Sequence, residues 1–326
     1  MKTVIFAVFV LTLSLVPCTS SAQSREVIDM TGRVVVIPES INRIVATYRV
    51  ATQMLLILEA SDKIVSVSFR PNPMTLRMFP ELETAGIANR HASIEEILRM
   101  KPDVVFAYPG DQVQSLDAAG IAVVTLVVEN PEALVKGLGL MAQVLGKTER
   151  AGKLAAYYQD KLKYITERTS RIQDRKRVYF MGGKLLTTIG GDFYQDHIIN
   201  MAGGISVSHD LHGGWVSISR EHLLAWNPDV ILTVAYYSSS LRDELLSDSG
   251  LSSLSAVKNG KVYAFPVYLD SWDLPSPESI LGIMWLAGIL YPGEISFDIA
   301  REAREFYTIF YGSYPEPISL EGRHDP

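Results

Sequence analysis

Cysteine is almost absent from this chain, since Cys18 is the only one among 326 residues. If an N-terminal segment containing it is removed, no disulfide can form and no thiol can act as a nucleophile. Clusters of Lys and Arg are also missing, and the formal net charge is −6. We therefore expect no nucleic acid as a partner. Beyond the N-terminus, no apolar run reaches the length of a membrane span.

Motifs of common exported hydrolases are missing too. The chain has neither a Gly-x-Ser-x-Gly nucleophile elbow nor the His-Glu-x-x-His pattern of metalloproteases. The absence of these motifs argues against an enzyme. Histidines such as His197 and His222 can still act as general bases, so an exported hydrolase remains the alternative from a different class.

Residues 1–22 have the pattern of a secretory signal peptide. A short positive start precedes an almost uninterrupted apolar stretch over residues 3–16, and small residues follow. The stretch is shorter than the roughly 20 residues of a membrane span. We expect cleavage after Ala22 and export to the periplasm. Lipid attachment at Cys18 is the alternative, although Pro17 stands where a lipoprotein signal carries Gly, Ala or Ser.

Short β-branched segments alternate with helical patterns along the rest of the chain. This alternation is typical of βα units around a mostly parallel sheet. A mature length of about 300 residues suggests about two domains. The predicted strands form one series at 33–37, 44–47, 64–69, 104–108 and 121–126, and a second at 178–181, 230–235 and 262–265. We predict an α/β fold with two Rossmann-like lobes, each built on a mostly parallel sheet.

Between the two series, residues 149–175 contain no Pro and carry apolar residues at helical spacing. We predict one long helix that bridges the lobes, about 35 to 40 Å long at about 1.5 Å per residue. Two shorter helices with a break near Thr169 and Ser170 are the alternative. The predicted organisation is a signal peptide (1–22), an N-terminal lobe (23–145), a bridging helix (146–175), a C-terminal lobe (176–312) and a flexible tail (313–326).

The chain also contains an internal repeat. Residues 95–105 align without gaps with residues 221–231. In each copy an acidic residue opens a short helix, a Pro ends it, and an Asp leads into an apolar strand. Ser93 and Ser217 are candidate N-caps, and only the first copy has the Glu that completes a capping box. Each lobe therefore carries the same helix, Pro, Asp and strand unit.

Several further segments accompany the two copies of the repeat along the chain: 29–38, 41–45, Gly203-Gly204 before 216–219, 257–263 and 271–282. Taken in order, these segments resemble the periplasmic binding protein family that serves siderophore, haem and cobalamin importers. Residues 271–282 are similar to the subgroup of that family for iron or other metal complexes.

This resemblance implies two lobes joined by one long helix, with the ligand held in the cleft between them. It also implies one glutamate per lobe that contacts arginines of an ABC permease, and the repeat puts Glu95 and Glu221 at those positions. An acidic residue in the first turn of a helix is favoured by the helix dipole and can meet a cationic partner. The alternative is that each glutamate only stabilises its own helix. We expect a monomer.

Ligands of open α/β sheets bind beyond the carboxyl ends of strands, so the loops after the predicted strands hold the candidate ligand residues. Aromatic rings offer stacking area, and Arg side chains bind carboxylate or hydroxamate-type oxygens, which suits a bulky anionic chelate. The candidates are Tyr48, Arg49, Phe69, Arg70 and Tyr108 in the first lobe, and His209, His212, Trp215, Tyr236, Tyr237, Tyr268, Trp272 and Asp273 in the second.

His209 and His212 are also candidate metal ligands, since imidazole suits iron, nickel, copper or zinc. The alternative is a polar surface loop. We expect no cofactor of the protein's own, because the metal arrives inside the transported ligand. The expected ligand is an iron-siderophore or related metal chelate, with cobalamin, haem and nickel or cobalt chelates as alternatives. A ligand sensor that feeds no importer is a further alternative.

Overall fold

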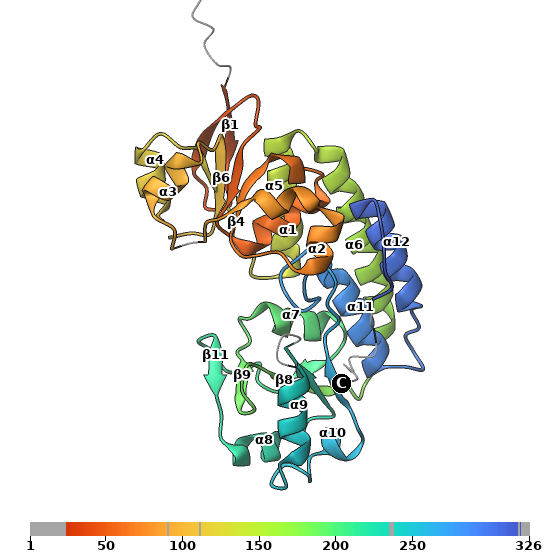
Figure 1. Cartoon of the computed structure of the whole chain (residues 1–326). Coiled ribbons are helices and arrows are strands. Elements are labelled where there is room, and N and C mark those ends of the chain that lie inside the picture. Colours follow the sequence, from red (N-terminus) through yellow and green to blue (C-terminus); the bar gives the residue numbers. More distant parts are fainter. Residues whose placement is uncertain (1–23, 90, 111, 235–237, 319, 321–326) are drawn as a thin grey trace, which may run out of the picture.

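The protein consists of two α/β lobes, joined along one side by the long helix α6 (Thr148–Thr169) (Figure 1). The structure is a computed structural model and describes residues 24–89, 91–110, 112–234, 238–318 and 320. The predicted signal peptide with Cys18, and the candidate ligand residues Tyr236 and Tyr237, lie outside the described residues.

The N-terminal lobe is built on a five-stranded parallel sheet in the order β5-β4-β3-β6-β7. Its central strands are short, β-branched and buried on both faces, as parallel strands covered by helices require. The strands are β3 (Ile44–Ala46), β4 (Ile64–Val67), β5 (Gly86–Ile87), β6 (Val104–Ala107) and β7 (Val123–Thr125). The helical segments are α1 (Arg49–Ile57), η1 (Ser61–Lys63), α2 (Pro73–Met78), η2 (Pro80–Thr84), α3 (Ile94–Arg99), α4 (Val113–Ala118) and α5 (Pro131–Leu145).

The first predicted strand does not join this parallel sheet. It forms β2 (Val34–Pro38), which pairs antiparallel with β1 (Ser24–Ile28), a strand that the sequence pattern did not reveal. The alternation of side chains buries Val27, Val35 and Ile37 and exposes the other face of the hairpin.

The C-terminal lobe repeats the arrangement with a four-stranded parallel sheet in the order β10-β8-β12-β13. Its strands are β8 (Arg177–Met181), β10 (Ile205–Ser206), β12 (Val230–Thr233) and β13 (Val262–Ala264), and a separate antiparallel pair is formed by β9 (Thr187–Ile189) and β11 (Trp215–Ser217). The helices of this lobe are α7 (Tyr194–Met201), α8 (Arg220–Trp226), α9 (Ser238–Ser247) and α10 (Ser255–Lys258).

The joint between the lobes contains α6, α11 (Ser279–Leu290) and α12 (Ile299–Tyr311). Helix α6 is a single helix, but it ends at Thr169 and not at residue 175, close to the break that the alternative placed near Ser170. Helix α11 has apolar residues on all sides and is buried for most of its length, as expected of a helix at the centre of a molecule.

The internal repeat is seen in both lobes as α3 followed by β6 and α8 followed by β12. Just before the Pro of each copy, Lys101 and Asn227 adopt positive φ and end the helix. The Asp that follows the Pro makes the same kind of hydrogen bond in both copies. The carboxylate of Asp103 accepts from the backbone N–H of Arg43 at 2.8 Å, and the carboxylate of Asp229 accepts from the backbone N–H of Arg177 at 2.8 Å. The predicted capping box at Ser93 is present.

One boundary prediction is wrong. The N-cap of α8 is Ser219 and not Ser217, because its side chain accepts from the third following backbone N–H. The described part of the predicted flexible tail is largely exposed but makes contacts with the joint through two of its side chains. Tyr314 stacks on Tyr307 with ring centroids 5.8 Å apart, and Ile318 is buried. The Tyr268 hydroxyl also donates to the backbone oxygen of Glu316 at 2.9 Å.

Candidate functional site

The strand order places two loops of the N-terminal lobe side by side. Strands β3 and β6 are neighbours at the point where the order reverses, and open α/β sheets bind ligands at such a point. The residues that follow these strands, Tyr48 and Tyr108, have ring centroids 5.3 Å apart. The Tyr108 hydroxyl donates to a carboxylate oxygen of Glu129 at 2.6 Å. Two predicted ligand residues are therefore brought together.

Arg49 is held in place from two sides. Its Nε and Nη2 donate to the two carboxylate oxygens of Asp270 at 3.0 and 2.5 Å, and its guanidinium lies 4.1 Å from the ring centre of Phe69. Gln53 also donates to Asp270, at 3.4 Å. Such a bidentate pair fixes the guanidinium plane and offsets its charge. Arg49 is therefore a rigid donor with a compensated charge.

Arg70 is the second candidate cation on this lobe, and its charge is less compensated than that of Arg49. It follows β4, its side chain is exposed, and within the described part of the chain no carboxylate lies within ion-pair distance of it. An exposed guanidinium of this kind can bind an anionic ligand through two parallel hydrogen bonds.

Trp215 presents an aromatic surface on the C-terminal lobe. It is 48% exposed and packs edge-on against Phe193, with ring centroids 5.2 Å apart. Its ring lies over Gly182, the residue after β8, where a Cβ would come within 2.6 Å of the indole. Gly182 is therefore required for the position of Trp215, and the indole is both exposed and fixed.

His209 is held by a buried carboxylate. Its Nδ1 lies 2.9 Å from Oδ2 of Asp196, and its side chain is 59% exposed whereas that of Asp196 is buried. Asn200 donates to the same carboxylate oxygen at 2.8 Å. The hydrogen bond to Asp196, followed by the charge of Asp196, raises the pKa of His209. Any side chain at position 191 would collide with His209, so Gly191 completes this support.

His212 is exposed and lies on the same loop. However, among the residues that the structure describes, no three His, Cys, Asp or Glu side chains gather closely enough to hold a metal ion. The two histidines therefore do not form a protein metal site with a third such ligand, and a metal would have to bring most of its own ligands.

The structure does not support cleft contact for three of the candidates. Tyr268, Trp272 and Asp273 are buried, because the chain after β13 enters the joint between the lobes. The Trp272 indole N–H donates to the hydroxyl of Tyr307 at 3.0 Å. These side chains support the joint, and in this conformation they offer no surface to a ligand.

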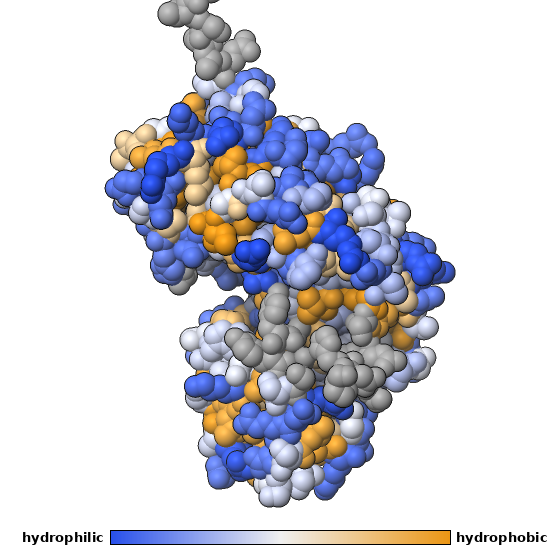
Figure 2. Space-filling model, viewed as in Figure 1, coloured by the Kyte–Doolittle hydropathy of each residue, from blue (hydrophilic) through white to orange (hydrophobic). Residues whose placement is uncertain are grey.

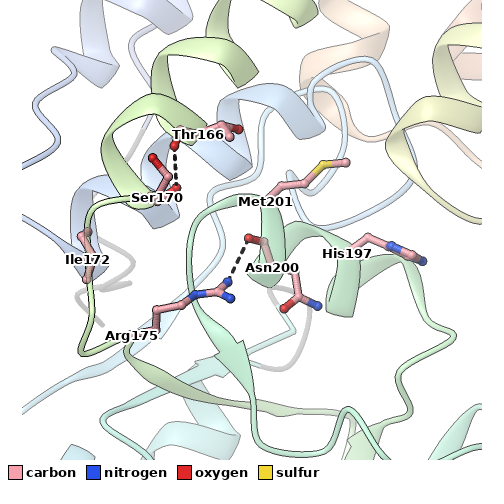
Figure 3. Close-up of a pocket in the computed structure, with 8 residues that line it drawn as sticks. Thr166, Ser170, Ile172, Arg175, His197, Asn200 and Met201 are labelled. Atoms are coloured by element: carbon pink, nitrogen blue, oxygen red, sulfur yellow. Dashed lines mark hydrogen bonds between the residues drawn. The ribbon is translucent and has the colours of Figure 1, made fainter.

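The molecule is hollowed between its lobes on the side away from α6 and α12 (Figure 2). The strand-end residues of both lobes are the candidates to line this hollow. A cavity of about 580 Å³ lies elsewhere, between the end of α6 and α7, and Figure 3 shows its lining. There Arg175 donates to the backbone oxygens of Asn200, Gly203 and Gly204, so its guanidinium caps α7.

The sequence did not reveal the residues that hold these side chains. Asp270 is 221 positions from Arg49, and Asp196 lies inside a helix where nothing marks it as a partner of His209. A Gly directly after a predicted strand, as at Gly182, was the one available signal, because such a residue permits close approach of another side chain.

Within the described residues, no helix is both long and apolar enough to span a membrane. The model of the family described as "Periplasmic binding protein" matches residues 44–269. The molybdate-binding protein MolA of Haemophilus influenzae is 28% identical over 91% of this chain and 94% of its own. A vitamin B12-binding protein of Yersinia pestis is 24% identical over 60% of this chain and 70% of its own.

Solved structures agree with this relationship. MolA bound to molybdate superimposes with a TM-score of 0.80 at 28% identity, over 90% of this chain and 99% of that one. A periplasmic solute-binding protein of Veillonella parvula gives 0.79 at 25% identity, over 90% and 94%. Both the two-lobed fold and the expectation of a binding protein are confirmed. The chain belongs to the periplasmic binding protein family, whose members are substrate-binding components of ABC transporters and not enzymes.

Proposed function

We propose that this protein captures a small anionic metal species in the periplasm and delivers it to an ABC importer. The observation that supports the proposal is a set of partly exposed side chains in both lobes, four of them in loops that follow parallel strands, and we place them along the hollow between the lobes. Tyr48, Arg70 and Tyr108 come from one lobe, and His209 and Trp215 from the other. Ligands of open α/β sheets bind beyond strand ends of this kind.

The charges of the candidate side chains favour an anionic ligand. Arg70 is exposed without a nearby carboxylate among the described residues, and the raised pKa of His209 favours its protonated form. Two ligand types meet this requirement. An oxyanion such as molybdate is supported by MolA, and an anionic chelate such as an iron-siderophore is supported by the exposed indole of Trp215, which could stack on an organic ligand. Cobalamin, haem and nickel or cobalt chelates remain alternatives.

Delivery requires a surface for the permease, and we assign it to the repeated helices. Glu95 in α3 and Glu221 in α8 are both exposed in a first helical turn. Hydrogen bonds with their own backbone amides, and then with Ser93 and Ser219, lower the pKa of each carboxyl. Both side chains therefore remain ionised and suit arginines of a membrane partner.

Thermal unfolding with a ligand panel tests the proposed cargo. The protein from residue 23 onward is heated with sodium molybdate, a ferric siderophore, haem, cobalamin, histidine-bound nickel, and sulfate as an anion control. A ligand of the folded state raises Tm in proportion to the logarithm of its concentration over Kd. We expect a shift with molybdate or the siderophore and none with sulfate. A shift only with cobalamin, or with no member of the panel, would contradict the proposed ligand class.

A further inference from the structure

Glu278 lies at the point where the two lobes meet. It is the residue before α11, and its side chain is completely buried. Directly beside it, the hydroxyl of Tyr158 in α6 donates to the backbone oxygen of Pro277 at 2.8 Å. Eight residues earlier in the same segment, Asp270 pairs with Arg49 of the N-terminal lobe. This segment therefore connects the lobes a second time, in addition to α6.

Within the described residues, neither carboxyl oxygen of Glu278 has a hydrogen-bond partner of normal geometry. The hydroxyls of Ser276 and Tyr311 lie beside it, and both are buried without a partner of normal geometry. An ionised carboxylate in such a place is strongly disfavoured, because its charge is neither hydrated nor paired. A neutral carboxylic acid avoids most of this cost.

The charged groups that act on Glu278 do not compensate for its burial. Burial is the main cause that raises its pKa well above the ordinary value, and the charge of Asp270 adds to it. The hydroxyls of Ser276 and Tyr311 act in the opposite direction, and the charge of Arg49, which is paired with Asp270, does so to a smaller extent. The ring hydroxyls facing the site from α6 and α12 have raised pKa values and stay neutral: Tyr158, Tyr307 and Tyr311.

We propose that Glu278 carries a proton at neutral pH and that loss of this proton loosens the joint between the lobes. The proton leaves to water, and the remaining carboxylate requires solvent that the closed joint excludes. The closed joint therefore binds one proton more than the loosened joint, in which Glu278 is hydrated. Between the two pKa values, the opening equilibrium rises about tenfold for each pH unit. The joint is thus a pH-responsive element, and this property needs no transported ligand.

The protonation state can be measured on the unmodified protein. With ¹³C at the side-chain carboxyl of every glutamate, one NMR resonance should keep the shift of a protonated acid at pH 7, after the others have titrated. In Glu278→Gln that resonance should disappear. Glu302→Gln is the matched control, because Glu302 is also buried but is paired with Lys161 at 2.9 Å. If all glutamates of the unmodified protein titrate near their ordinary pKa, the proposal is wrong.

Hydrogen exchange tests the loosening. Between pH 6 and 7, protection factors of amides in α1 and α11 should fall about tenfold in the unmodified protein, and should change much less in Glu278→Gln. Amides in β6 and β12, inside the lobes, provide the reference. Equal pH dependence in the two proteins would overturn the role of Glu278 in the joint. If Glu278→Gln does not fold, the unmodified protein still tests the proposal. Protection factors that do not change with pH would contradict it.

Discussion

At the scale of single residues, one short segment shows how surroundings decide the state of a carboxyl group. Asp270 is buried but accepts hydrogen bonds from Arg49, Gln53 and the backbone N–H of Ser271. Asp273 is equally buried, yet its partners are the neutral side chains of Ser271 and Gln195. Burial raises the pKa of Asp273 to about 6. Residue type alone therefore says little about charge.

This difference predicts a pH dependence of stability. Because folding raises the pKa of Asp273, its protonated form stabilises the fold at about pH 4, and that contribution is lost as the pH rises through about 6. The loss is about 3 kcal/mol in the free energy of unfolding. In Asp273→Asn this pH-dependent loss should be absent, so the variant should gain stability relative to the unmodified protein between pH 4 and 7. Urea unfolding at several pH values measures this, and parallel profiles would contradict it.

At the scale of elements, the repeated helices α3 and α8 present the same surface twice. Each begins with a Ser N-cap, carries an exposed glutamate in its first turn, and ends before a Pro and an Asp that ties it to a neighbouring strand. The strand bonds fix the position of each helix on its lobe. The spacing of the two glutamates therefore follows from the fold and from the angle between the lobes.

A transport assay tests these helices as docking elements. Glu95→Ala and Glu221→Ala should each lower uptake roughly 10- to 100-fold, because a charge-assisted contact contributes about 1.5–3 kcal/mol. Ligand affinity should not change. Glu149→Ala is the matched control, since Glu149 is also an exposed first-turn acid, on α6. Normal uptake in the double variant Glu95→Ala, Glu221→Ala would show that the glutamates only stabilise their helices.

At the scale of the whole molecule, the sequence predicted what depends on local pattern. The β-branched runs and the repeat both appear in the structure, since periodicity and Pro position fix them. Long-range packing was not predictable. Tyr268, Trp272 and Asp273 read as loop residues but are buried in the joint, and the tail around Tyr314 packs on α12. Nothing in a local window shows that the lobes close over these segments.

The central claim is that a ligand is held by partly exposed side chains from both lobes. It is tested most directly by calorimetric titration of the panel member that raises Tm. Arg70→Ala and Trp215→Ala, one from each lobe, should each weaken binding roughly tenfold or more, since a charged hydrogen bond or an aromatic contact contributes about 1–3 kcal/mol. Arg171→Ala, an exposed arginine beyond α6, should leave Kd unchanged. Unchanged affinity in both cleft variants would contradict a site between the lobes.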